Sequence, residues 1–374
     1  MQTQSKFRLL AVRLGAMGDI LHALPAVTAL RMAHPEWVID WVVEPKWRAL
    51  LAADNSAGRD TDSLSPKQPV IDQLRFASTK QWREGMLSAQ TRKEIGDLCR
   101  ELKAGEYDTV LDLQGAIRSA AVSRMTGCRR IIGESSPREW AARWLFTERI
   151  KTRRQHVIEQ DVELASAVAG DELAPVHPWL PVDESAESWA DDILPRSDGE
   201  RAVLMNPGAG WGAKCWPTER YAEVARALLA RGFRVFVNAG PGEVLLSDAV
   251  VQRTGGGATP LICSLQQLIS VTRRVALVIA GDTGPLHLAC ALGRPVVGIY
   301  GPTEPSRNGP FGSRFRVLRS PESRRDHSRH EAPEAGLLTI VPEDVLRVAD
   351  ELLYPEATWC PSLQIHRIHK APGN

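Results

Sequence analysis

Apolar and polar positions follow a repeating order along this chain. A short apolar run is followed by a turn rich in glycine or acidic residues, and then by a stretch with apolar residues at helical spacing. Short apolar runs bounded by turns predict buried parallel strands, whereas apolar residues three and four positions apart predict helices. Strands that alternate with helices indicate an α/β protein with parallel, doubly wound sheets.

The first half of the chain carries this pattern from close to its beginning. We expect strands at residues 7–14, 38–43, 70–74, 107–113 and 129–133. We expect helices at residues 20–32 and 92–104, a third that carries Arg118 and Arg124, and a fourth that ends at Ala169. The polar residues 52–68 are predicted to form a loop, because they lack apolar periodicity.

The second half restarts the same plan after residues 171–198, which are rich in proline and acidic residues and predict a domain boundary. Strands are expected at residues 202–206, 234–239 and 275–280 and before Gly301, and helices at 218–230, after Glu243, at 265–272 and at 342–353. Residues 320–335 are charged and predict a loop. We therefore expect two Rossmann-like domains, residues 1–180 and 181–353, and a tail, residues 354–374.

Composition narrows the function classes. The chain has 374 residues, 43% of them hydrophobic, which suffices for two cores. A net charge of +1 gives no support for nucleic-acid binding, so no nucleic-acid partner is expected. The six cysteines form no CxxC pair, which argues against a zinc site or a disulfide framework and fits a reducing cytoplasm. We expect no signal peptide, and no apolar run reaches the ~20 residues of a membrane span.

The segment that follows the expected strand at 275–280 predicts a phosphate site. The sequence Gly281-Asp282-Thr283-Gly284-Pro285 ends the strand and begins a helix, with proline in the first turn, where no backbone N–H is needed. Unpaired N–H groups at such a helix start face the carboxyl end of the sheet, where α/β proteins bind anionic groups. The alternative is an ordinary strand-to-helix loop. His287 either donates to a ligand oxygen or caps a turn.

Two further residues of the second half follow predicted strands. Lys214 could neutralise a phosphate as a point charge, or it could be a solvated loop lysine. Glu243 could accept hydrogen bonds from two ribose hydroxyls, or it could simply favour the start of a helix. Neither a GxxxxGK[ST] loop nor a GxGxxG turn after the first strand occurs, which disfavours an ATPase or a dinucleotide dehydrogenase.

In the first half, Asp19 follows Gly18 at the start of a predicted helix. Such a carboxylate could take a proton from an attacking hydroxyl, or it could be an N-cap aspartate. His22, one turn later, could orient Asp19 or merely pack. Gln114 ends a strand at the same sheet edge and could line an acceptor pocket, and Arg118 could pair with anionic groups of an acceptor.

The chain resembles glycosyltransferase family 9 in the segments RLGAMGDILHALPAVTALRMAHPEWVIDWVVEP, DLQGAIRSAAV, QHVIEQDVEL, KCWP and AGDTGPLHLACALGRPVVGIYGPTEP. The resemblance implies a GT-B fold, in which two Rossmann-like domains face each other across a cleft. It also implies that the tail packs back on the N-terminal domain. The N-terminal domain would bind the acceptor, and the C-terminal domain would bind a nucleotide sugar.

The resemblance further implies an inverting transfer of L-glycero-D-manno-heptose from ADP-heptose to Kdo of Kdo-lipid A, with Asp19 as general base. The expected donor-binding residues are Lys214, Glu243, Asp282, Thr283, Gly284 and His287, and the expected acceptor-binding residues are Gly18, His22, Gln114, Arg118 and Arg83. No DxD motif is evident, so no metal ion and no cofactor are expected. A lipid acceptor implies an enzyme of the cytoplasm in peripheral contact with the inner membrane.

Alternatives stay open at this point. Residues 56–90, where the family carries basic acceptor contacts, match poorly and offer few basic residues, so the donor sugar or the acceptor glycan could differ. A GT-B sugar-nucleotide epimerase would leave Asp19 without a role, because its acid–base groups would surround the donor in the second domain. A non-catalytic nucleotide-sugar binder would likewise not need Asp19.

Overall fold

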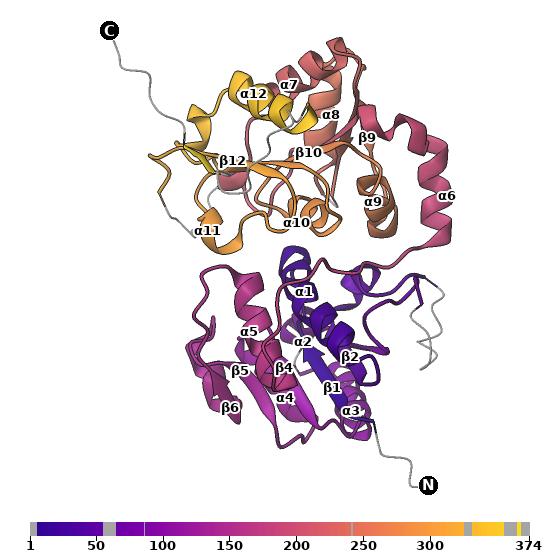
Figure 1. Cartoon of the computed structure of the whole chain (residues 1–374), viewed down its shortest axis with the longest axis vertical. Coiled ribbons are helices and arrows are strands. Elements are labelled where there is room, and N and C mark those ends of the chain that lie inside the picture. Colours follow the sequence, from indigo (N-terminus) through magenta and orange to yellow (C-terminus); the bar gives the residue numbers. More distant parts are fainter. Residues whose placement is uncertain are drawn as a thin grey trace. The chain divides into compact units, whose positions relative to one another are not determined.

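The computed structural model describes residues 6–54, 65–85, 87–240, 242–324, 331–354 and 365–367. The chain separates into two compact units, Met1–Asp183 and Glu184–Asn374, whereas the sequence pattern placed the boundary after residue 180. Figure 1 shows a parallel sheet with helices around it in each unit.

The first unit is built on a six-stranded parallel sheet in the order β3-β2-β1-β4-β5-β6. The order reverses between β1 and β4, and at such a switch point the turns after the two strands diverge and leave room for a ligand. The strands are β1 (Arg8–Val12), β2 (Val38–Val43), β3 (Gln73–Phe76), β4 (Thr109–Asp112), β5 (Ile131–Glu134) and β6 (Glu148–Ile150).

Helices surround this sheet and complete its core. Leu10 and Val12 of β1 and Val110 of β4 are fully buried and share one hydrophobic cluster with Leu98 and Leu102 of α3. Burial on both faces explains why β1 reads as a continuous apolar run. The helices are α1 (Met17–Ala33), α2 (Thr79–Glu84), α3 (Ala89–Ala104), α4 (Ile117–Met125) and α5 (Val157–Ala169), with the 3₁₀ helices η1 (Pro45–Leu50) and η2 (Trp140–Leu145).

The second unit repeats the topology in a seven-stranded parallel sheet, β13-β12-β11-β10-β7-β8-β9, with its switch point between β7 and β10. The strands are β7 (Ala202–Asn206), β8 (Arg234–Asn238), β9 (Thr259–Leu261), β10 (Leu277–Gly281), β11 (Val296–Tyr300), β12 (Phe315–Arg319) and β13 (Ile365–Arg367). β13 belongs to the tail and pairs with β12. The rest of the tail beyond Tyr354 lies outside the described residues.

The helices of the second unit bury a second core, in which Val203, Met205, Leu277 and Ile279 of the central strands meet Leu352 of the last helix. They are α6 (Glu184–Ile193), α7 (Thr218–Ala230), α8 (Val244–Arg253), α9 (Leu265–Thr272), α10 (Gly284–Ala291), α11 (Pro305–Asn308) and α12 (Pro342–Leu353), with the 3₁₀ helices η3 (Arg196–Arg201), η4 (Gly212–Lys214) and η5 (Leu337–Thr339).

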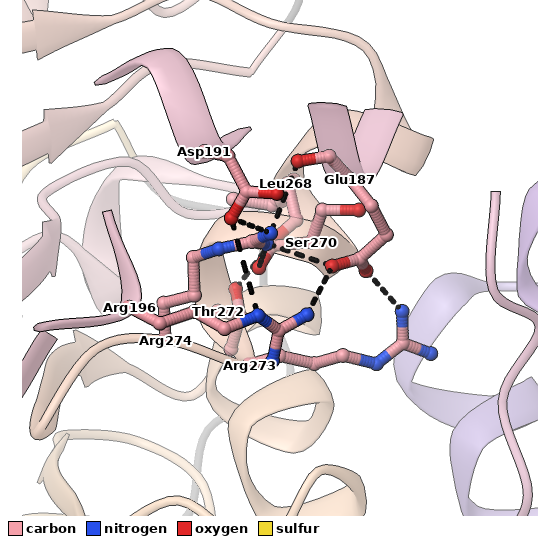
Figure 2. A network of polar contacts seen from close by, with 8 residues as sticks. All are labelled: Glu187, Asp191, Arg196, Leu268, Ser270, Thr272, Arg273 and Arg274. Atoms are coloured by element: carbon pink, nitrogen blue, oxygen red, sulfur yellow. Dashed lines mark hydrogen bonds and ion pairs between the residues drawn. The ribbon is translucent and has the colours of Figure 1, made fainter. Parts of the chain in front are cut away.

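The α/β class and the doubly wound architecture predicted from the sequence are confirmed. Within residues 171–198, where the sequence pattern predicted a domain boundary, residues 184–193 form α6, a helix that the sequence pattern did not predict. Its acidic residues are not merely solvated: Glu187 and Asp191 pair with arginines at the end of α9 (Figure 2). The short strands β6 and β9 and the 3₁₀ helix η2 were also not expected. Of the predicted loop 320–335, residues 325–330 lie outside the described residues.

Candidate active site

In the second unit, the turns predicted to bind a donor follow four adjacent strands, β11, β10, β7 and β8. Lys214, in η4 after β7, forms an ion pair with Asp282, which directly follows β10. A Cβ atom added to Gly281 would lie 3.2 Å from the carbonyl oxygen of Lys214, so the two turns are in contact at the switch point. The fold therefore brings together two residues 68 positions apart in sequence.

Asp282 is the centre of a small charged network. His287 Nε2 lies 3.3 Å from Asp282 Oδ1, and Lys214 Nζ lies 4.2 Å from the centroid of the Trp211 ring. Burial by itself would raise the pKa of Asp282, but the hydrogen bond to His287 and the charge of Lys214 outweigh it and lower that pKa. Asp282 therefore stays ionised and holds Lys214 and His287 in place.

The start of α10 is the place where the sequence predicted a phosphate site. Thr283 is the N-cap in extended conformation, and its hydroxyl donates to the carbonyl of Gly281 at 3.2 Å. Gly284 and Pro285 begin the first turn, in which Pro285 has no N–H and the Leu286 N–H donates to the Thr283 carbonyl at 3.2 Å. Within the described residues, no hydrogen bond uses the amides of Thr283 and Gly284. These amides and the nearby Lys214 can together bind a phosphate group.

Glu243 lies at the N-cap position of α8, where its Oε2 accepts a hydrogen bond from the Gly240 amide at 3.1 Å. Burial raises the pKa of its carboxyl, and the Gly240 amide lowers it in part. A Cβ atom added to Gly208 would lie 2.1 Å from Glu243 Oε2, so a side chain at this position would displace the carboxylate. Glu243 thus lies between the turns that follow β7 and β8.

In the first unit, Asp19 is the third residue of α1 and not its N-cap. Its Oδ2 accepts a hydrogen bond from the Ala16 amide at 3.0 Å, and its Oδ1 lies 3.2 Å from Arg13 Nη2. The Asp19 side chain is 34% exposed. The carboxylate is therefore held by two donors and is still accessible to a substrate.

Arg13 is a site residue that the sequence analysis missed. Its buried guanidinium also donates to the carbonyl of Leu113, and Gln114 Oε1 accepts a hydrogen bond from the Leu14 amide at 2.8 Å. These contacts join the turns after β1 and β4 at the switch point. The sequence shows a charged arginine near the end of an apolar strand, and this feature could have indicated a role in the site. Arg13 was instead counted as part of the expected strand at residues 7–14.

Two buried carboxyl groups, those of Asp112 and Asp161, interact electrostatically with Arg13. Asp112 accepts hydrogen bonds from the amides of Gln114 and Gly115, at 2.9 and 2.8 Å, and burial raises its pKa. Asp161 of α5 is 4% exposed, and its Oδ2 has no hydrogen-bond partner within the described residues. Burial raises the pKa of Asp161 to about 7; the charge of Arg13 lowers it in part, and Asp19 raises it further.

The other predicted acceptor residues differ in position. Gly18 is half-buried in the first turn of α1, and His22, one turn after Asp19, is buried with its ring edge-on to His156 at 5.9 Å. Arg118 is exposed in the first turn of α4, beside Gln114 in sequence. Arg83 is exposed on α2, which follows the edge strand β3, and no described interaction joins it to Asp19.

The described part of the chain has neither a metal-binding cluster nor a membrane-spanning helix. No group of three or more His, Cys, Asp or Glu side chains is placed to hold a metal ion there. None of the described helices is both long and apolar enough to cross a bilayer.

Comparison with known proteins identifies the family. The family glycosyltransferase family 9 (heptosyltransferase) matches residues 95–337. Lipopolysaccharide heptosyltransferase 1 of Escherichia coli K12 is 28% identical, with 84% of this chain and 94% of that protein covered. The enzyme of the same name from Pseudomonas aeruginosa is 26% identical, with 82% and 81% covered.

Solved structures agree with the sequence comparison. E. coli heptosyltransferase WaaC with ADP-2-deoxy-2-fluoro heptose is similar with a TM-score of 0.73 and 26% identity, with 92% of this chain and 99% of that chain covered. A family 9 glycosyltransferase from Veillonella parvula, 22% identical, shares the fold with a TM-score of 0.77, with 95% and 99% covered. The chain described here belongs to glycosyltransferase family 9 and is a glycosyltransferase.

Proposed function

We propose that this enzyme transfers L-glycero-D-manno-heptose from ADP-heptose to Kdo of Kdo-lipid A, in the inner core of lipopolysaccharide. The observation that carries the proposal is the accessible Asp19 carboxylate, held by Arg13 and the Ala16 amide at the switch point of the first unit. The similarity to heptosyltransferases 1 over more than four-fifths of the chain supports this donor and this acceptor. The accessible Asp19 carboxylate also favours this reaction over an epimerase or a non-catalytic binder, because neither of these functions gives Asp19 a role.

Asp19 is the general base in this proposal. As a Kdo hydroxyl oxygen attacks the anomeric carbon of the heptose, its proton passes to the Asp19 carboxylate. The bond between the anomeric carbon and the diphosphate oxygen breaks on the opposite face, ADP leaves, and the anomeric configuration is inverted. Arg13 and the Ala16 amide keep the carboxylate oriented during this step. The proposed acceptor-binding residues are Gly18, His22, Gln114, Arg118 and Arg83. Arg83 differs from the others in lying on α2, which follows the edge strand β3 and not a strand at the switch point.

The second unit stabilises the leaving group. Negative charge develops on the diphosphate as the glycosidic bond breaks, and Lys214 with the amides of the first turn of α10 supply fixed positive potential. Asp282 and His287 hold Lys214 in position, Thr283 and Gly284 present the amides, and Glu243 binds the ribose hydroxyls. Lys214 with these amides can stabilise the leaving group, so we expect transfer to proceed without a divalent cation.

A transfer assay tests the proposal. ADP-heptose and Kdo-lipid A are incubated with the wild type, with Asp19→Asn and with Asp97→Asn, and the product is detected by its mass. We expect Asp19→Asn to lose about 10²- to 10⁴-fold in kcat, the usual range for a general base. Its affinity for ADP should be unchanged. Asp97→Asn is the matched control, because Asp97 is an exposed carboxylate of α3 in the same unit.

The remaining outcomes separate donor from acceptor. Wild-type enzyme that binds ADP-heptose but forms no product would contradict the acceptor, and enzyme that does not bind ADP-heptose would contradict the donor. Transfer that is abolished by EDTA and restored by magnesium would contradict a metal-free mechanism. Cell fractionation tests the proposed location in the cytoplasm at the inner membrane.

A further inference from the structure

The first unit exposes two tryptophans side by side on η2. Trp140 is 61% exposed and Trp144 is 63% exposed, and their ring centroids lie 5.6 Å apart with the planes nearly perpendicular. Tryptophan is one of the largest apolar side chains and is normally mostly buried. Two neighbouring exposed indoles therefore indicate a surface with a ligand or partner of its own.

Arginines accompany this pair. The guanidinium carbon of Arg143 lies 5.5 Å from the centroid of each tryptophan ring, and that of Arg149 lies 5.9 Å from Trp144. Neither arginine forms an ion pair within the described residues. Residues 137–154 contain six basic residues and two acidic ones. Both acidic side chains are occupied, because Glu139 accepts from the Ile117 amide and Glu148 pairs with Arg130. The surface thus combines apolar rings with unneutralised positive charge.

The same surface adjoins the turn that carries the proposed acceptor residues Gln114 and Arg118. The Glu139 amide donates to the carbonyl of Gly115 at 2.9 Å, and Glu139 Oε2 accepts from the Ile117 amide at 2.8 Å. The side chain of Ile117 is itself 48% exposed. Because α4 packs against η2, the tryptophans are fixed next to the acceptor turn within one rigid part of the unit.

We propose that Ile117, Trp140, Arg143, Trp144 and Arg149 form a docking surface for the headgroup region of an anionic phospholipid bilayer. Indole rings favour the interface between water and hydrocarbon, because one edge is polar and the body is apolar. Each arginine near an anionic membrane surface adds electrostatic attraction. The choice of a bilayer as the occupant rests on the proposed function, whose acceptor sugar is attached to a lipid embedded in a membrane.

Vesicle co-sedimentation tests the proposal with the full chain and without any acceptor. The wild type should bind vesicles of phosphatidylcholine mixed with phosphatidylglycerol, and bind phosphatidylcholine alone at least tenfold more weakly. Trp140→Ala/Trp144→Ala should weaken binding to both at least tenfold. Arg143→Gln/Arg149→Gln should remove the preference for anionic vesicles.

The matched controls are Leu245→Ala and Arg100→Gln, which change exposed apolar and basic residues elsewhere. Unchanged ADP affinity and thermal unfolding show that each variant is folded.

Turnover separates this proposal from the proposed function. The double tryptophan variant should raise KM for acceptor embedded in vesicles and leave KM for an acyl-free, water-soluble acceptor unchanged. Failure of the wild type to transfer heptose would refute the proposed function, while vesicle binding would still be decided by sedimentation. The docking surface is refuted if the wild type does not bind anionic vesicles or if the tryptophan variant binds them equally well. It is also refuted if that variant only converts a dimer to a monomer, because the occupant would then be a second copy of the chain.

Discussion

At the scale of single residues, the charge of Arg13 acts on two carboxyl groups, those of Asp19 and Asp161. Asp19 pairs with it directly, whereas Asp161 is buried behind it without a hydrogen bond to its Oδ2 within the described residues. The charged groups that act on Asp161 come from different elements: Arg13 after β1, Asp19 on α1, Glu134 on β5 and Asp112 on β4. Because Asp161 has a raised pKa of about 7, it is largely protonated below neutral pH and leaves Arg13 to Asp19.

This raised pKa predicts a pH dependence of stability. Well below pH 4, Asp161 is protonated in both the folded and the unfolded chain. As the pH rises to 7, the unfolded chain loses this proton first, so the folded state loses up to about 4 kcal/mol relative to a variant without the group. Asp161→Asn should therefore be more stable than the wild type at pH 8, with a difference that shrinks towards pH 4. Urea unfolding across this pH range measures it.

Glu159→Gln is the matched control for that experiment, since Glu159 is a partly exposed carboxylate on the same helix. A pH dependence that Asp161→Asn shares with Glu159→Gln would not be specific to Asp161. A difference for Asp161→Asn that stays constant with pH would show that Asp161 ionises at its ordinary pKa in the folded protein.

The residue scale also shows the limit of sequence reasoning. Asp282 and Thr283 could be placed at a helix start from local sequence alone, because glycine and proline mark where the strand ends and the helix begins. The environment of Asp161 could not be predicted in this way. Arg13 and Asp112 are distant from it in sequence and come near it only because of the order of the strands in the sheet. For the same reason the sequence could name Lys214 but not its ion pair with Asp282.

At the scale of elements, α6 is held by charge as well as by apolar burial. Ala186 and Ala190 are buried, and Trp189 and Ile193 are half-buried. Arg274, whose side chain is 1% exposed, donates to Glu187 Oε2 at 2.9 Å, to Asp191 Oδ1 at 2.7 Å and to the Ser270 carbonyl at 2.8 Å (Figure 2). Arg273 pairs with the other oxygen of Glu187 at 2.7 Å. This network holds α6 to the end of α9.

Removal of one charged partner from this network should therefore lower the free energy of unfolding much more than a substitution at an exposed position. Glu187→Gln leaves the buried guanidinium of Arg274 with a weaker partner, and we expect a loss of about 3 kcal/mol in the free energy of unfolding of the second unit. Asp192→Asn, an exposed acidic position of the same helix, should change it by less than about 0.5 kcal/mol. Chemical denaturation measures both. Equal effects of the two substitutions would show that α6 is not held by the network.

The network explains why α6 was not predicted from the sequence. A segment rich in proline, aspartate and glutamate is typical of a solvated connection, and residues 171–183 are indeed irregular. The arginines that neutralise α6 lie more than 80 positions later in the sequence. By contrast, α7, α9 and α12 were predicted with their observed bounds, because each shows apolar residues at helical spacing.

At the scale of the whole molecule, one topology is used twice with different chemistry at equivalent places. Both sheets reverse their order between the first and fourth strands of the unit. In the first unit the turns there carry Asp19 and Gln114, and in the second they carry Lys214 and Asp282. The fold thus supplies two candidate ligand-binding edges, one with an accessible carboxylate and one with a cation beside a helix start.

This division predicts that the nucleotide stabilises one unit selectively. ADP at 100 times its Kd should add about 2.7 kcal/mol to the second unit, because only the folded unit binds it. In hydrogen exchange read by mass spectrometry, the turns after β7, β8 and β10 should then exchange more slowly, while the start of α1 with Asp19 should be unaffected. Lys214→Ala should abolish the protection, and Lys103→Ala, on an exposed helix end of the first unit, should preserve it. Equal protection at Asp19 would mean that ADP alone couples the two units, against the separate roles argued here.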